Sequence, residues 1–83
     1  MQITVKYRGP LAELVKTEKE SIDAKNIKDV LRHIRKQYSA AAEKKAKTML
    51  IVVNGRNILL LKHFNTILKD SDEVNFLPIC GGG

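Results

Sequence analysis

One segment of the chain has the apolar spacing of an α-helix, and it restricts the fold to one main helix packed against other elements. Between positions 27 and 38, apolar side chains recur every third or fourth residue and fall on one helix face: Ile27, Val30, Leu31, Ile34 and Tyr38. Asn26 precedes them as a favoured N-cap, and Asp29 places a negative charge in the first turn. We therefore expect an amphipathic helix that begins at Ile27.

The residues before this helix have the pattern of two strands joined by a helical turn. Ile3, Val5 and Tyr7 alternate with polar residues, which indicates a half-buried strand, and Gly9-Pro10 ends it. Residues 17–22 form a weaker, charge-rich strand that would pair with the first. Between the two, residues 11–16 are expected to make one helical turn with three side chains under the sheet edge: Leu11, Leu14 and Val15.

The residues after the helix indicate three more strands. The apolar run 49–53 is typical of a strand that is covered on both faces, and Asn54-Gly55 is a favoured hairpin turn into a strand over 58–61. Residues 70–73 are a second turn, and the last strand is expected over 74–79, ending at Pro78 or running on as an edge. Residues 39–47 form either a helical extension or a mobile connector.

The predicted fold class is therefore α+β, with a mixed sheet of four to five strands crossed by one main helix. A chain of 83 residues makes a single domain, which we place at residues 1–79, followed by a flexible glycine tail at 80–83. A domain of this size buries only about 60–65% of its unfolded surface, so its core is too thin for a deep pocket.

Several classes of protein are excluded by simple counts. One cysteine leaves no intrachain disulfide, and the cytoplasm is the expected location. The longest apolar run has five residues, against the roughly 20 that a spanning helix needs, so no membrane association is expected. The first residues show no secretory signal.

The last four residues, Cys80-Gly81-Gly82-Gly83, are the most suggestive chemical feature. Glycine lets a backbone enter a slot where side chains would clash, and the group it delivers is the terminal carboxylate. From Ile79 to Gly83 an extended tail reaches about 17 Å. The alternative interpretation is a frayed terminus without function.

A carboxylate must be activated before it accepts sulfur or an amine, usually as an acyl-adenylate. The chain has no glycine-rich phosphate loop and no Gly-Lys-Ser/Thr motif. The activating machinery must therefore belong to a partner, so the chain is expected to be a carrier or substrate and not an enzyme.

The order and spacing of these motifs resemble those of the small sulfur carriers. The matching segments cover nearly the whole chain: Val53-Asn54-Gly55-Arg56-Asn57-Ile58, then 66–74, Phe76-Leu77-Pro78 and Gly82-Gly83. That group includes the molybdopterin synthase small subunit and the thiamine-biosynthesis sulfur carrier, both with ubiquitin-like β-grasp folds. The turn at 11–14 and the helix start at 26–31 fit the molybdopterin branch better.

The resemblance implies a function and partners. A ubiquitin-activating-like enzyme would adenylate Gly83 with ATP and Mg²⁺, and a persulfide donor would convert it to a thiocarboxylate. The carrier would then dock on the large molybdopterin synthase subunit, with Gly81 and Gly82 threading the channel, and donate sulfur to the pterin precursor. No cofactor or metal would bind to the carrier itself. The alternatives are a ubiquitin-like protein modifier, a sulfur carrier for thiamine or another pathway, and a passive interaction module.

The chain departs from the family pattern at two positions. Ser71 replaces a usual glycine, which costs about 1–2 kcal/mol if that position needs a positive φ. Ile79 replaces a second proline.

A docking surface is expected next to the tail. Alternation in the last strand turns Val74 and Phe76 inward and leaves Leu77 on the opposite face. An exposed Leu77 beside Tyr7 or Pro78 would form an apolar patch for the synthase. The competing interpretation is packing of Leu77 under the sheet edge.

The remaining candidate residues are expected to have no direct role in the chemistry. Cys80 is taken as an incidental tail residue, with a thiol relay as the alternative, and His33 and His63 have no second ligand at zinc spacing. The basic residues that cluster in and after the helix usually form a solvated face; no nucleic-acid binding is expected, and steering of an acidic activating enzyme is the other alternative. They are Lys25, Lys28, Arg32, Arg35, Lys36, Lys44, Lys45 and Lys47.

Overall fold

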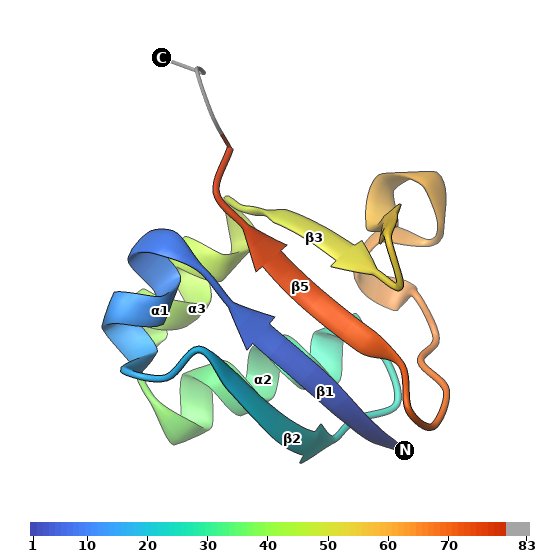
Figure 1. Ribbon diagram of the computed structural model, residues 1–83, viewed down its shortest axis with the longest axis horizontal. Helices are drawn as coiled ribbons and strands as arrows, with labels where there is room; N and C mark the ends of the chain where they lie inside the picture. Colours follow the sequence, from blue (N-terminus) through green and yellow to red (C-terminus); the bar gives the residue numbers. More distant parts are fainter. Residues whose placement is uncertain (80–83) are drawn as a thin grey trace.

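Five strands form one mixed sheet in the order β2-β1-β5-β3-β4 (Figure 1). The computed structural model describes residues 1–79. Strand β1 (Gln2–Tyr7) pairs antiparallel with β2 (Lys19–Asp23) and parallel with β5 (Glu73–Leu77), and β5 pairs antiparallel with β3 (Leu50–Val53). The last strand in the sequence therefore lies in the middle of the sheet. The expected α+β architecture is confirmed.

Helix α2 (Ile27–Gln37) covers one face of this sheet, as its apolar stripe predicts. Asn26 caps it, because its Oδ1 accepts a hydrogen bond of 2.9 Å from the backbone N–H of Asp29. The apolar face of α2 meets the inward side chains of the two central strands, and the buried residues of these three elements form the centre of the core: Ile3, Val5, Tyr7, Ile27, Val30, Leu31, Ile34, Val74 and Phe76.

Two further helices are shorter than α2. Helix α1 (Gly9–Val15) buries Leu11 and Val15 as expected, but Leu14 points outward and is 44% exposed, so its predicted burial is wrong. Residues 39–47, for which an extension and a connector were both open, contain a separate helix, α3 (Ala40–Lys47). Ser39 caps it, and its alanines 42 and 46 are fully buried. Small side chains at this spacing let α3 pack closely without a wide apolar stripe.

The predicted strand at 58–61 is wrong. Strand β4 contains only Arg56–Asn57, and the chain then turns into two 3-10 helices, η1 (Ile58–Leu60) and η2 (His63–Asn65). The side chain of Asn57 explains the early end of β4: its Oδ1 accepts a 2.9 Å hydrogen bond from the N–H of Leu59 and caps η1. An apolar run alone does not distinguish a strand from such a turn.

In the two turns next to the start of β5, Asn54-Gly55 has the backbone that its residues indicate, whereas Ser71 has a positive φ that a serine rarely adopts. Asn54 and Gly55 have φ of 49° and 86°, and Ser71 has φ of 72°. The Asn54 side chain ties the two turns together: its Nδ2 donates to Asp72 Oδ1 (2.8 Å) and its Oδ1 accepts from the Glu73 N–H (2.9 Å). Strand β5 ends at Leu77, directly before Pro78.

Among residues 1–79, no helix has the length and apolar character needed to cross a membrane.

Candidate docking surface at the end of the central strand

Strand β5 places the start of the C-terminal tail at the end of the sheet opposite the two turns (Figure 1). The strand is held on both sides, by β1 and by β3, so Leu77 and Pro78 have a fixed position relative to the core. The residues expected to carry the chemistry, Gly81, Gly82 and Gly83, and also Cys80, lie outside the described residues. The described part of the site is the surface around the base of the tail.

Leu77 lies on the sheet face opposite α2, next to two apolar side chains of β3. It is the direct cross-strand partner of Leu50, and Val52 follows two residues further along on the same face, opposite Asn75. Side chains that are direct partners on one face lie within contact distance. All three are half-buried, and we call Leu50, Val52 and Leu77 the outer patch.

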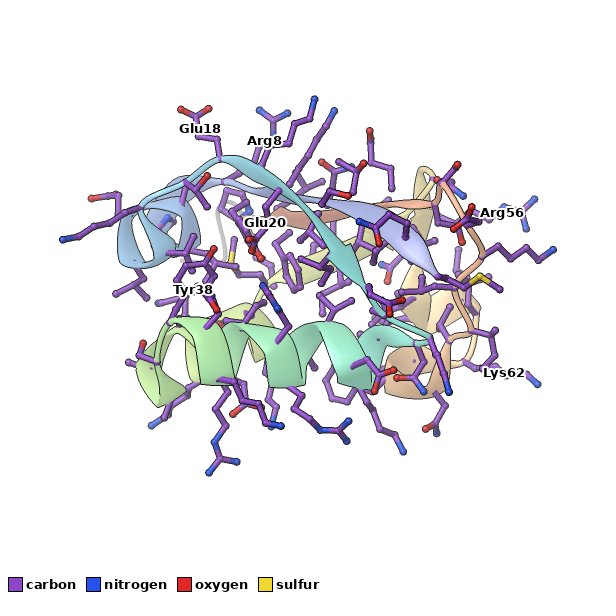
Figure 2. All side chains as sticks on the ribbon, turned by 90° about the horizontal axis from the view of Figure 1, so that it is seen from below. Arg8, Glu18, Glu20, Tyr38, Arg56 and Lys62 are labelled. Carbon is purple, nitrogen blue, oxygen red and sulfur yellow. The ribbon has the colours of Figure 1, made fainter. Side chains whose placement is uncertain are left out.

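The outer patch corrects the interpretation of the apolar run 49–53. That run predicts a strand covered on both faces, but only Ile51 and Val53 of β3 are buried, while Leu50 and Val52 face outward. Figure 2 shows the reason: α1, α2 and α3 lie below the sheet, and no helix of residues 1–79 covers its upper face. The same run was therefore the signal for two site residues that the sequence reasoning missed.

Tyr7 is not part of this surface, so its expected docking role is wrong. Its side chain is 1% exposed, because the alternation of β1 turns residues 3, 5 and 7 toward α2. The ring stacks on Phe76 with centroids 6.0 Å apart and planes 19° from parallel. The phenol Oη donates a hydrogen bond to Glu20. Burial, together with this neighbouring carboxylate, raises the pKa of Tyr7.

The carboxylate of Glu20 contacts three polar side chains between β2 and α2. Its Oε2 accepts hydrogen bonds from Tyr7 Oη and Tyr38 Oη (2.9 Å), and it lies 3.1 Å from His33 Nε2. In Figure 2, Glu20 and Tyr38 point toward one another across the space between sheet and helix. Burial and the hydrogen bond to Glu20 raise the pKa of Tyr38 to about 12. This cluster fixes Tyr7, and through the Tyr7 ring Phe76, beneath the docking face.

Pro78 extends the docking surface from Leu77 toward the tail. Its ring is exposed on one side and lies against the backbone of Gly9 on the other. Gly9 has a φ of +57°, which favours glycine, and a Cβ added there would lie 3.4 Å from Pro78 Cγ. Ile79 follows and is 65% exposed. The start of α1 thus supports the first residue beyond β5.

The two histidines among residues 1–79 both contact neighbouring side chains. No group of three or more His, Cys, Asp or Glu side chains within residues 1–79 is placed to hold a metal ion. His33 is engaged with Glu20 and the ring of Tyr38. His63 lies edge-on against Phe64, with ring centroids 4.1 Å apart.

Comparison with known proteins identifies relatives along almost the whole chain. The model of the ThiS family matches residues 5–83. The solution structure of the small archaeal modifier protein 1 (SAMP1) from Methanosarcina acetivorans is 29% identical, with a TM-score of 0.83 over 99% of this chain and 96% of that one. A comparison with curated protein sequences gives no match.

Two further structures are similar and contain a second protein. One is the complex of subunits 1 and 2 of the molybdopterin-converting factor from Helicobacter pylori, with 25% identity, full coverage of both chains and a TM-score of 0.71. The other is the BexX/CysO complex of Amycolatopsis orientalis, with 15% identity, a TM-score of 0.80 and coverage of 98% and 99%, which supports the fold alone. The expected ubiquitin-like β-grasp is thereby confirmed.

Proposed function

The chain belongs to the ThiS family of small sulfur carriers and ubiquitin-like modifiers, and from this premise we propose that it carries sulfur as a C-terminal thiocarboxylate on Gly83 for molybdopterin (molybdenum or tungsten cofactor) biosynthesis. The observation that carries the proposal is the family match, which runs through the glycines to residue 83. The 25% identity to a molybdopterin-converting factor subunit along its full length supports this pathway.

The chemistry follows from the terminal carboxylate of the tail. The α-carboxylate of Gly83 is ionised at neutral pH and is a poor electrophile. A ubiquitin-activating-like enzyme in the cytoplasm therefore adenylates it with ATP and Mg²⁺, which are bound by the enzyme and not by the carrier. The outer sulfur of a persulfide donor then attacks the acyl carbon and AMP leaves, which gives an acyl disulfide. A second thiol cleaves the S–S bond of this intermediate, forms a disulfide with the donor's remaining sulfur, and so releases the thiocarboxylate. Gly81 and Gly82 thread the tail into each partner's active site, where larger side chains would clash.

The docking surface holds the domain outside the partner while the tail reaches in. The outer patch and Pro78 lie next to the base of the tail, and both are apolar and partly exposed. Burial of such a patch stabilises a complex by about 25 cal/mol for each Å² of apolar surface removed from water. We assign this surface to the large molybdopterin synthase subunit.

The second candidate is a ubiquitin-like modifier, joined through Gly83 to lysines of other proteins. The observation in its favour is the 29% identity to SAMP1, a small archaeal modifier protein. The third candidate function is a sulfur carrier for thiamine or another product, because related carriers for other pathways use the same activated tail.

Reconstitution with the purified activating enzyme, sulfur donor, large synthase subunit and pterin precursor tests the proposal. We expect formation of the dithiolene product, and we expect deletion of Gly82-Gly83 to abolish it without changing the melting temperature. Isopeptide-linked ladders without sulfurated product would instead identify the modifier. Product formation by the truncated chain would refute the role of the tail.

A further inference from the structure

The positive charge of the protein is concentrated on one pair of helices. From Ile27 to Lys47, which spans α2 and α3, the chain has seven basic residues and two acidic ones. Five of the six net positive charges therefore lie on this pair, and the rest of the chain is close to neutral. Figure 2 shows many of these nitrogen-tipped side chains projecting from α2 away from the sheet. This face lies opposite the outer patch.

A groove of about 320 Å³ runs along this basic face between α2, α3 and η2. Its polar walls contain four basic side chains and one acidic one: Lys28, Arg32, Arg35, Lys47 and Glu43. Its apolar part is the half-buried ring of Phe64 and the side chain of Leu31. A concave surface that combines charge with an apolar contact is typical of binding sites, whereas scattered solvated lysines need no groove.

Most of the cations in the groove have no anionic partner within the described part of the chain. Arg32 contacts Asp29, with 3.0 Å between Nη1 and Oδ1. Among residues 1–79, Lys28, Arg35 and Lys47 form no ion pair. Their charges are therefore available to a ligand.

The composition of the groove favours an acidic polypeptide over a nucleic acid. Single strands bind by stacking bases on exposed aromatic rings, but Tyr7 and Phe76 are buried, and Phe64 is half-buried with His63 against it. An acidic peptide offers carboxylates for the arginines and an aliphatic side chain for Phe64, whereas a phosphate backbone offers anionic oxygens but no aliphatic side chain for that ring.

We propose that the groove between α2 and α3 binds an acidic segment of a protein partner, with an aliphatic side chain of that segment on Phe64. Because the groove and the outer patch lie on opposite sides of the molecule, both partners bind at the same time. This proposal does not depend on sulfur transfer, because neither the tail nor the outer patch takes part.

Fluorescence anisotropy with a labelled peptide tests the proposal. The probe is a glutamate-rich peptide of about twelve residues, close to the length of α2, with leucines at i and i+4. We expect saturable binding that the double variant Lys28→Glu/Arg35→Glu weakens about tenfold or more. The matched control is Lys19→Glu/Arg56→Glu, two exposed sites on β2 and β4, which makes the same charge change and should alter the affinity less than about twofold.

Nuclear magnetic resonance titration of the labelled full chain locates the probe. Amide shifts should concentrate on α2, α3 and Phe64. Equal weakening by the two double variants, absence of saturation, or shifts spread over the sheet would overturn the proposal. Tighter binding of a single-stranded RNA of equal charge, with shifts in the groove, would also overturn it and assign the groove to nucleic acid.

Discussion

Leu50 and Leu77 are direct partners across β3 and β5 on the uncovered face of the sheet, at the point where the tail begins. Both are half-buried, so part of each side chain is available for contact with another molecule. We expect Leu77→Lys to weaken association with the large synthase subunit about tenfold or more, because a charge would be buried at the centre of the interface. Calorimetric titration measures the affinity.

The same substitution at a distant position of the same face provides the control. Thr4 is also half-buried and points outward from β1, but it pairs with Ser21 and Glu73, far from the tail. Thr4→Lys should leave the affinity unchanged, and both variants should melt within a few degrees of the parent chain. An unchanged affinity for Leu77→Lys would remove the outer patch from the interface.

Ser71 has a backbone conformation that lowers the stability of the fold. Its φ of 72° favours glycine, and its backbone N–H donates a 2.8 Å hydrogen bond to the carbonyl of Gln2, which a glycine would keep. We expect Ser71→Gly to raise the free energy of unfolding by about 0.5–1 kcal/mol. Urea denaturation measures the change. Ser71→Ala keeps the strain and should give no gain; a loss of stability in Ser71→Gly would contradict this account.

A side chain at Gly9 should destabilise the fold because of the backbone conformation of this residue. At a φ of +57°, Gly9→Ala should cost about 1–2 kcal/mol of folding free energy. The added Cβ would lie 3.4 Å from Pro78 Cγ, at the limit of ordinary contact, so the loss should persist in a Pro78→Ala background. Urea denaturation of the four proteins of this double-mutant cycle gives the coupling, expected below about 0.5 kcal/mol. If Gly9→Ala cost little stability in the Pro78→Ala background, contact with the Pro78 ring would be the cause of the loss, and the account based on the backbone would be contradicted.

Alkaline pH should destabilise the fold through the tyrosines that contact Glu20. Burial and that carboxylate raise the pKa of Tyr38 to about 12, and they raise the pKa of Tyr7 as well. Above about pH 10 the unfolded chain loses these phenolic protons while the folded chain keeps them, so the free energy of unfolding falls as the pH rises. Denaturation between pH 9 and 12 should show a flatter fall for Tyr38→Phe. An identical slope in both proteins would contradict the role of Tyr38.

The periodic segments of the fold could be predicted because local spacing determines them. The alternation at Ile3, Val5 and Tyr7 predicts a strand with one buried face, and the stripe that begins at Ile27 predicts a helix with one buried face. The structure confirms both as β1 and α2. The segment 58–61 could not be assigned in this way, because a side-chain cap from Asn57 decided it. Which face of β3 is open depends on where the helices pack, so the exposure of Leu50 was not readable from its apolar run.

The alternation of apolar residues in β1 is sufficient to predict the burial of Tyr7. The alternation that places Ile3 and Val5 inside also places Tyr7 inside, and its polar hydroxyl is satisfied by Glu20, a residue of the neighbouring strand. A tyrosine near a functional end of a chain is therefore not evidence of exposure. The pairing partner of its hydroxyl depends on the register of β1 with β2, which one sequence does not specify.

Intact-mass spectrometry tests the central claim most directly, because it reports the chemical state of the last residue. After incubation with the activating enzyme, ATP, Mg²⁺ and a persulfide donor, the chain should gain about 16 Da, the exchange of one oxygen for sulfur, and fragmentation should place the gain on Gly83. An unchanged mass with an enzyme that is active on its own carrier, or a gain located at Cys80 instead, would contradict the account.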